Sequence, residues 1–172
     1  MKQHETDTAR DKFLKAYDEL SDSLFSHCFY RVSDREVALD LTQETFVKTW
    51  EYMANGKEIG NLRPFLFKVA GNLIIDHYRK KKSDSLDTLQ EAGFDVASED
   101  AQRIVSSSEG KHALEALGAL DEKYRQVVLM RYVDELSPRE IGEIIGESEN
   151  AVSVRINRSI NKLKELLKFN QY

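Results

Sequence analysis

The stretch that decides the fold of this chain is 137–164, SPREIGEIIGESENAVSVRINRSINKLK. It opens with Ser-Pro-Arg-Glu at 137–140, a capping-box pattern with proline in the first helical turn. Gly146 tolerates a left-handed backbone and is expected to end this short helix. Ser148 can then cap a longer helix that carries several basic side chains. The stretch therefore predicts a helix of about two turns, a tight turn and a second, basic helix, which together form a helix-turn-helix.

Two interpretations of this stretch remain open on the residues alone. In a DNA-binding helix-turn-helix, the second helix enters a major groove about 12 Å wide. Ile141 and Val152 would then join the two helices, while Arg155 and Arg158 would face phosphates or base edges. The alternative is an αα-hairpin whose basic face is merely solvated. The caps, the glycine turn and the basic helix agree with one another, and together they favour DNA binding.

The composition is that of a globular protein with a heavily charged surface. Of the 172 residues, 41% are hydrophobic and 32% are charged. The single cysteine, Cys28, excludes an internal disulfide framework and a multi-cysteine zinc site. Residues 1–10 are polar and do not resemble a signal peptide, and no apolar run approaches the ~20 residues of a membrane span. We expect a cytoplasmic protein.

The charge is segmented along the chain. The formal net charge of -5 does not suggest a nucleic-acid binder. A local field depends on where the charges lie, however, and basic residues gather at 79–82 and again at 155–168. Acidic residues gather between these blocks, at 84–100. Two basic segments are therefore available to contact phosphates.

The first half of the chain predicts three helices. Apolar residues at spacings of three and four indicate a helix over 13–28. Ser-Asp-Arg-Glu at 33–36 matches a second capping box, with Ser33 as the N-cap, and Asn-Gly at 55–56 is expected to end the helix that follows. Pro64 is acceptable only in a first helical turn, so the third helix is expected over 62–82.

The remainder predicts a linker and four more helices. Residues 83–107 lose the apolar periodicity and are rich in Ser and Asp, which is typical of a flexible acidic linker. Helical spacing returns near residue 108, and Asp121 is placed to cap the second helix of this part. Neither half shows the alternation of a strand. The expected fold is all-α, with two small helical domains.

Two further segments allow either a bland or a functional interpretation. The basic block 78–82 closes the third helix, where cations are favourable whatever the function, so a solvated end and a phosphate contact are both open. Asp-Leu-Thr-Gln-Glu at 40–44 forms an acidic patch near Phe46 and Trp50. This patch could be a protein-docking surface or simply a solvated helix face.

Motifs of catalysis are missing from the sequence. It contains no glycine-rich phosphate loop, nucleophile elbow or paired-histidine metal motif, so we expect no enzyme activity, no cofactor and no metal site. His27 and Cys28 are neighbours in sequence and would point to different sides of a helix. Cys28 itself lies on the apolar face and is expected in the core.

Three motifs, in order, resemble a known family. They are DLTQETF at 40–46, PFLFKVAGNLIIDHYR at 64–79 and the helix-turn-helix. Their order and separation are similar to those of the extracytoplasmic-function (ECF, group 4) RNA polymerase sigma factors of the sigma-70 family. The resemblance spans about residues 10–168 and implies sigma domain two over 9–82, a linker over 83–107 and sigma domain four over 108–168. It implies a factor that binds the polymerase core, directs it to promoters and melts the minus-ten element without ATP.

The resemblance assigns roles to the ambiguous segments. The acidic patch would bind the clamp helices of the polymerase β′ subunit, through Leu39, Asp40, Gln43, Glu44, Phe46 and Trp50. The third helix and the loop before it would hold the minus-ten element as a single strand, with one base flipped into a pocket. The residues that this role implicates are Lys57, Asn61, Lys68, Asn72, Asp76, Arg79 and Lys80.

The second helix of the helix-turn-helix departs from the family pattern. The family has Gly-Thr-Val, a basic residue and then Ser-Arg where this chain has Asn-Ala-Val-Ser-Val-Arg at 150–155. Ser153 replaces the basic reader, Val154 replaces its polar neighbour, and Glu147 and Glu149 add negative charge. We therefore expect weak reading of the minus-thirty-five element. The positions implicated in that reading are Arg139, Asn150, Ser153, Val154, Arg155, Asn157 and Arg158.

The resemblance also implies partners. They are the polymerase core, through its β′ clamp helices and β flap, promoter DNA, and an anti-sigma factor or another recruiting protein. The weakened recognition helix suggests that an additional DNA-bound protein supplies the upstream contact. The rival hypothesis is a two-domain regulator that binds duplex DNA without polymerase, in which case Asp40 and Gln43 would be dispensable.

Overall fold

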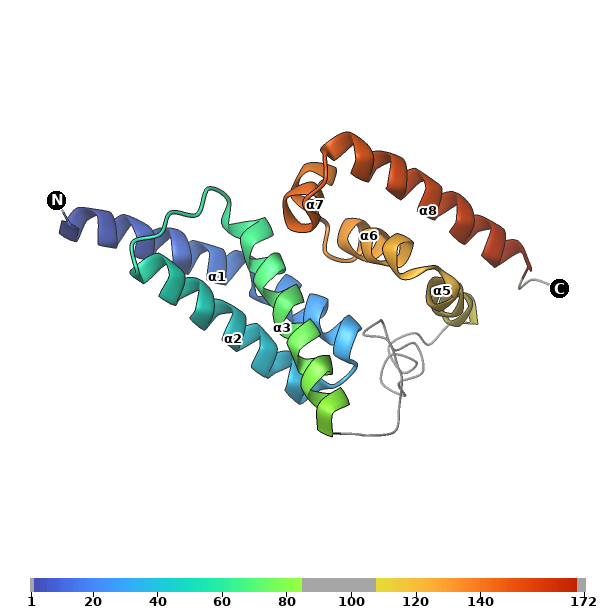
Figure 1. Cartoon of the computed structure of the whole chain (residues 1–172), viewed down its shortest axis with the longest axis horizontal. Helices are drawn as coiled ribbons and strands as arrows, with labels where there is room; N and C mark the ends of the chain where they lie inside the picture. Colours follow the sequence, from blue (N-terminus) through green and yellow to red (C-terminus); the bar gives the residue numbers. More distant parts are fainter. Residues whose placement is uncertain (1, 85–107, 170–172) are drawn as a thin grey trace.

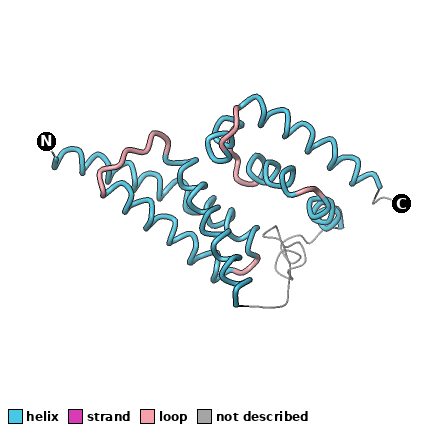
Figure 2. Tube along the Cα trace, viewed as in Figure 1, coloured by secondary structure: helices cyan, strands magenta, loops and turns pink. Residues whose placement is uncertain are grey.

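Two helical bundles make up the part of the chain that the structure describes (Figure 1). The computed structural model describes residues 2–84 and 108–169, with side chains described for 8–81 and 110–168. Within these residues all regular structure is helical, and loops join the helices (Figure 2). The predicted all-α class is confirmed. The predicted linker lies outside the described residues from position 85 onward, and the third helix runs two residues beyond its predicted end at 82.

The N-terminal bundle is a set of three helices in which each packs against the other two. In chain order these helices are α1 (Lys2–Val32), α2 (Arg35–Ala54) and α3 (Leu62–Asp84). Leu24 and Cys28 of α1 and Leu66 and Phe67 of α3 are almost completely buried between them. Cys28 is therefore a core residue, as expected from its apolar helix face.

The junction between α1 and α2 differs from the prediction by one residue. The N-cap of α2 is Asp34, whose carboxylate accepts the backbone N–H of Val37 at 3.0 Å. Ser33, the predicted cap, has a left-handed backbone with φ +55°. An N-cap residue takes an extended conformation, as Asp34 does with φ -130°, so Ser33 cannot fill that position. The predicted capping box at 33–36 is wrong.

The other predicted signals of the N-terminal bundle are confirmed. Asn55 is the C-cap of α2, and Gly56 follows it with φ +76°. Pro64 is the third residue of α3, where its missing N–H costs no helical hydrogen bond. Asn61 lies just before α3, and its side chain accepts the backbone N–H of Arg63 at 3.2 Å.

The C-terminal bundle contains the helix-turn-helix. Its helices are α5 (Ser108–Ala119), α6 (Glu122–Tyr132), α7 (Pro138–Ile145) and α8 (Glu149–Phe169). Val127, Ile141 and Val152 form its buried centre. Asp121 holds the N-cap position of α6 as predicted, although its side chain accepts no capping hydrogen bond.

The two bundles are in direct contact. Helix α3 packs against α7, and the buried apolar residues of the two bundles form one continuous cluster. Leu136, in the loop between α6 and α7, is fully buried in this cluster. None of the described helices combines the length and the apolar character that a membrane span requires.

Candidate functional site

The helix-turn-helix has the local geometry that its sequence predicts. The backbone N–H of Ser137 donates to a carboxylate oxygen of Glu140 at 2.9 Å, and the N–H of Glu140 donates to the Ser137 hydroxyl at 3.2 Å. Gly146 ends α7 in the left-handed conformation, with φ +75°. At Gly142 a Cβ atom would lie 2.5 Å from the backbone oxygen of Glu147, so only glycine fits this close approach. These contacts fix the angle between α7 and α8.

One face of α8 is open to solvent. The opposite face packs into the bundle through Val152, Ile156 and Ser159, which are all buried. The predicted minus-thirty-five residues that the structure leaves exposed are Arg139, Asn150, Val154, Asn157 and Arg158. Val154 is 42% exposed, which makes it one of the most exposed large apolar residues described.

Two predicted minus-thirty-five residues are engaged within the chain. Arg155 is half-buried, and its guanidinium donates to both carboxylate oxygens of Glu147, at 2.5 and 2.7 Å. The Ser153 hydroxyl donates to the backbone oxygen of Glu149 at 3.0 Å. In this structure Arg155 therefore ties α8 to the turn before it rather than extending toward solvent.

The predicted minus-ten residues are all exposed. Lys68, Asn72 and Asp76 recur every four residues and form one stripe along α3. Asp76 forms an exposed ion pair with Arg79 at 3.7 Å. In the loop before α3, the Lys57 ammonium lies 4.8 Å from the centre of the Tyr52 ring. Lys80 follows Arg79 at the exposed end of the stripe.

The predicted core-binding residues divide between the surface and the packed interior. Asp40, Gln43 and Glu44 are exposed on α2, and Leu39 is half-buried beside them. Phe46 is buried and Trp50 is half-buried, and both rings contact Phe13 of α1, with centroids 6.0 and 5.1 Å apart. The aromatic pair thus supports the α1–α2 packing beneath the acidic face.

Exposed apolar residues that the sequence did not predict to be at the surface lie on the same pair of helices. Val47 is 55% exposed, and Leu14 and Tyr17 of α1 are nearly half exposed. Tyr17 shares the helical spacing of the apolar α1 face, so spacing alone placed it in the core. No local signal in the sequence distinguishes it from its buried neighbours.

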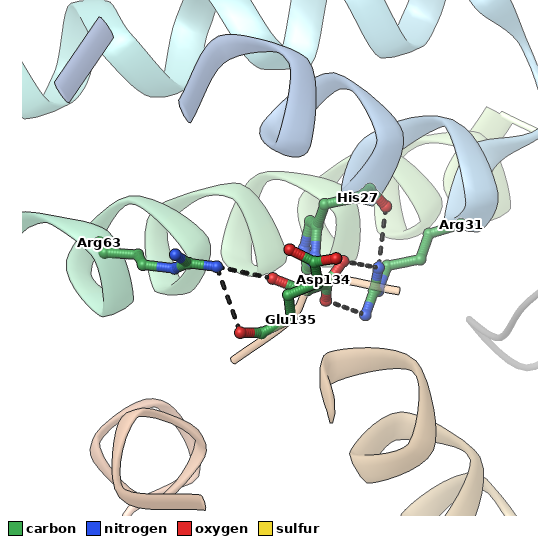
Figure 3. Close-up of polar contacts among 5 residues, drawn as sticks. All are labelled: His27, Arg31, Arg63, Asp134 and Glu135. Carbon is green, nitrogen blue, oxygen red and sulfur yellow. Dashed lines mark hydrogen bonds and ion pairs between the residues drawn. The ribbon is translucent and has the colours of Figure 1, made fainter. Parts of the chain in front are cut away.

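A buried polar cluster joins the two bundles (Figure 3). The Asp134 side chain, in the loop between α6 and α7, is completely buried. Its carboxylate accepts the Nδ1–H of His27 at 2.8 Å and a guanidinium N–H of Arg31 at 3.0 Å, both from α1. Arg31 also donates to the backbone oxygen of His27 at 2.9 Å. The Asp134 carboxylate of the C-terminal bundle is therefore held by two side chains of the N-terminal bundle.

The protonation states in this cluster follow from its burial. Burial lowers the pKa of His27, and the nearby Arg31 charge lowers it further, so the imidazole is neutral. Burial alone would raise the pKa of the Asp134 carboxyl, but His27 and Arg31 hold that pKa below its ordinary value. The Nε2 atom of His27 is buried and has no hydrogen-bond partner among the described residues. A second proton on this ring would thus be without an acceptor.

A second arginine, Arg63, reinforces the contact between the bundles. The Arg63 guanidinium of α3 donates to the backbone oxygens of Asp134 and Glu135, at 3.1 and 3.3 Å (Figure 3). It also lies 3.9 Å from the Glu140 carboxylate of the capping box. Because Glu135 has a left-handed backbone, its carbonyl and that of Asp134 can face the same guanidinium.

Two clefts lie along the contact between the bundles. An open cleft of about 650 Å³ is lined by Asn61 of the N-terminal bundle and by Arg139 and Glu140 of the C-terminal bundle. A narrower, mainly apolar groove of about 220 Å³ is lined by Lys68 and Asn72 on one side and by α6 and α7 on the other. Asn61 and Arg139, which are predicted for different promoter elements, thus line the same open cleft. Among the described residues no His, Cys, Asp and Glu cluster could hold a metal ion.

Comparison with known proteins identifies both bundles. Residues 16–84 match the family model described as Sigma-70 region 2, and residues 113–163 match Sigma-70, region 4. The chain is 30% identical over 136 residues to the ECF RNA polymerase sigma factor SigM of Bacillus subtilis, covering 77% of this chain and 81% of SigM. It is 29% identical over 171 residues to SigW of the same organism, covering 92% of this chain and 90% of SigW.

Solved structures support the fold. The sigma factor RpoE of Bartonella quintana, solved with the anti-sigma factor NepR, has a TM-score of 0.66 at 23% identity, covering 91% of this chain and 97% of that chain. CnrH, solved with the cytosolic domain of CnrY, has a TM-score of 0.65 at 22% identity, covering 95% of this chain and 94% of that chain. The matches to both sigma regions and to SigM place this chain in the ECF group of the sigma-70 family of RNA polymerase sigma factors.

Proposed function

We propose that this protein binds RNA polymerase core, directs it to specific promoters and captures the melted minus-ten element to initiate transcription. The observation that carries the proposal is the presence of both sigma regions in one chain, each with most of its predicted contact residues exposed. The domain bounds that we propose are 9–82 for sigma domain two and 108–168 for sigma domain four.

The α2 surface supports a core-binding role. Asp40, Gln43 and Glu44 are exposed together, and exposed Val47 adds an apolar contact beside them. Apolar area within a polar rim is the usual anatomy of a protein interface. We propose that this face binds the β′ clamp helices, while domain four contacts the β flap.

The α3 surface supports capture of a single strand. Lys68 and Asn72 offer a cation and an amide along one stripe, and Arg79 and Lys80 extend it with more positive charge. Phosphate contacts of this kind are needed to offset the few kcal/mol that unstacking a base costs. No nucleotide hydrolysis is required, because the binding energy itself traps the melted strand.

The contact between the bundles implies a conformational step. Asn61 and Arg139, predicted for different promoter elements, line one cleft. The two elements are about 25 base pairs apart, which is roughly 85 Å of B-DNA at about 3.4 Å per base pair. One chain cannot contact both elements while these residues share a cleft, so we propose that the bundles separate when the promoter is bound.

Protein partners beyond the polymerase are also proposed. RpoE of Bartonella quintana and CnrH were each solved with a partner protein, an anti-sigma factor in the case of RpoE. We propose that an anti-sigma factor controls this chain as well. Because Ser153 and Val154 remove basic character from α8, we further propose that a second DNA-bound protein strengthens upstream binding.

A reconstituted transcription assay tests the proposed function. The purified chain plus core polymerase should start transcription at discrete promoters, with start sites mapped by run-off. Asp40→Arg reverses the charge at one position of the α2 face, so it should abolish both core pull-down and run-off product. Glu165→Arg makes the same charge change at an exposed position of α8 and should retain core binding.

Two results would reject the proposal. Identical start sites with and without the protein would show that it does not select promoters. Tight duplex binding without polymerase, unaffected by Asp40→Arg, would favour the rival regulator that acts through its helix-turn-helix alone.

A further inference from the structure

Amide and aliphatic side chains form a continuous exposed stripe on α8. Asn150, Val154, Asn157 and Asn161 follow one another at intervals of four, three and four residues, and all are exposed. This spacing places them on one face of a helix. The stripe runs from the first turn of α8, the end that a recognition helix presents to the major groove.

The two arginines next to this stripe, Arg155 and Arg158, differ in their contacts. Arg155 is held by both carboxylate oxygens of Glu147, so its guanidinium is turned toward the preceding turn. Arg158 is exposed beside Asn157, and its side chain remains available for a phosphate or a base. The part of the face that is free of internal ion pairs therefore presents carboxamides and a valine more than guanidinium groups.

The chemistry of these side chains matches one kind of base pair. An asparagine carboxamide offers a donor and an acceptor together, which pairs with N7 and the N6 amino group of adenine. An aliphatic side chain favours the C5 methyl group of thymine, whereas guanine is the usual partner of arginine and lysine. Val154 and Asn157 are three residues apart, so their Cβ atoms lie within about 6 Å and can reach neighbouring base pairs.

We infer that Val154 and Asn157 make α8 a reader of adenine–thymine pairs in the upstream promoter element. Asn157 binds the major-groove edge of an adenine, and Val154 contacts the methyl group of a thymine in the same or the adjoining pair. The substitutions that remove basic character from α8 thus change its preferred sequence as well as weakening its hold on phosphates. This inference rests on the proposed promoter-binding function and names the bases that domain four selects.

Base analogues that remove single atoms test the inference with the intact holoenzyme. A promoter found by start-site mapping is rebuilt with one upstream thymine at a time replaced by deoxyuridine, which lacks the methyl group. In a second series each upstream adenine is replaced by 7-deazaadenine, which lacks N7. Holoenzyme binding to each duplex is measured by fluorescence anisotropy at fixed salt, because affinity for DNA depends strongly on salt.

In each series we expect one promoter position at which the base analogue weakens holoenzyme binding. Loss of the thymine methyl should weaken binding roughly four-fold, the value of one buried methyl-sized group. Loss of the adenine N7 should weaken it roughly five-fold or more, because a bidentate pair is broken. Val154→Ser should remove the sensitivity to deoxyuridine alone, and Asn157→Ala should remove the sensitivity to 7-deazaadenine alone. Both residues are exposed, so neither variant should disturb the fold.

Three results would overturn the inference. Holoenzyme that starts at its promoters but is insensitive to both analogues would reject base reading by this stripe and leave the proposed function intact. Sensitivity to 7-deazaguanine that Arg158→Ala removes, with none to the thymine and adenine analogues, would assign reading to the arginine instead. Failure of the protein to support any promoter-specific start would reject the proposed function and the inference together.

Discussion

The two helices predicted to contact DNA, α3 and α8, differ in how accessible they are in this structure. The stripe on α8 that includes Val154 and Asn157 is open to solvent. On α3 the side chains of Lys68 and Asn72 are exposed, but they line a groove whose other wall is the C-terminal bundle. DNA can approach α8 as the structure stands, whereas Lys68 and Asn72 of α3 face the C-terminal bundle across this groove.

The difference arises from the contact between the bundles, where the buried cluster of His27, Arg31 and Asp134 lies beside the apolar residues that the two bundles share. A buried ion pair contributes little net stability compared with apolar residues of similar size, because desolvation offsets most of the attraction. Removal of one partner is costly, however, since the other charge is left buried and unpaired. The cluster thus favours one arrangement of the bundles. Separation of the bundles exposes both Arg31 and Asp134 to water, so this arrangement can be lost without leaving a buried, unpaired charge.

The largest effect on the contact between the bundles, and so on the accessibility of α3, is expected from Asp134→Ala. When the bundles are in contact, which we call the closed arrangement, the variant leaves the Arg31 guanidinium without its carboxylate. The free energy of the closed arrangement should rise by about 3–5 kcal/mol. The bundles should separate, the radius of gyration measured by small-angle X-ray scattering should increase, and α3 should become accessible to single-stranded DNA. Helical content measured by circular dichroism should stay the same.

Asp18→Ala is the matched control for this variant. It removes the same side chain from an exposed position of α1 that has no role in the contact. An Asp134→Ala protein as compact as the Asp18→Ala protein would show that the buried cluster does not hold the bundles together.

A smaller separation of the bundles is expected when the pH is lowered. In the closed arrangement the pKa of His27 lies below its ordinary value of 6.5, whereas separation of the bundles solvates the ring. The open form therefore binds the proton more readily, so closure is favoured fully above pH 6.5 and is lost as the pH falls below it. Scattering between pH 8 and pH 5 should show expansion. His27→Gln should remove this pH dependence, and expansion that persists in the variant would assign it to other groups.

A third prediction concerns the geometry behind the open α8 face. Gly142→Ala places a methyl group against the backbone oxygen of Glu147, which cannot move aside as a flexible side chain would. We expect a loss of about 1–3 kcal/mol in the free energy of unfolding, measured by urea denaturation. Gly71→Ala is the control on α3, where nothing lies within 4 Å of the added atom. It should be neutral or stabilising by about 0.5–1 kcal/mol, and equal destabilisation by both variants would contradict the close approach.

The smallest expected effect comes from Glu147→Gln. Loss of the carboxylate frees Arg155 from its ion pair with Glu147, so the guanidinium can reach a phosphate. The slope of log affinity against log salt for duplex binding by the holoenzyme should steepen by about one unit. Glu149→Gln removes the same charge two residues further along the chain but frees no arginine, so it should leave the slope nearly unchanged. Equal slopes in the two variants would show that the Arg155–Glu147 pair does not restrain DNA binding.

The features of this molecule that the sequence predicts are those set by residues close to one another in the chain. The capping box of Ser137 and Glu140 and the left-handed Gly146 act within four residues of themselves, so the bounds of α7 and the start of α8 are predictable. The same logic misassigned the cap of α2, because Ser33 and Asp34 are both good capping residues and only the backbone path selects Asp34. Surface placement of the α3 stripe likewise follows from spacing along one helix.

Contacts between distant residues were not predictable from local patterns. His27 and Asp134 are 107 positions apart, and neither has a neighbour in sequence that marks it as a partner. His27 lies in an apolar helix, where periodicity shows only that it is near the core. Asp134 precedes a helix-turn-helix in a polar loop, where an exposed side chain is the ordinary expectation. The arrangement of the bundles therefore comes from the structure alone.

The distance between α3 and α8, measured with and without the polymerase, tests directly whether the bundles separate when the promoter is bound. Spin labels on Lys81→Cys and Lys164→Cys, both exposed, report this distance by pulsed electron resonance. The native Cys28 should remain unlabelled, because burial raises its thiol pKa to about 11 and leaves little reactive thiolate. We expect a single distance in the free protein and a longer one in holoenzyme bound to its promoter. An unchanged distance in a holoenzyme that initiates transcription would contradict the proposed separation of the bundles.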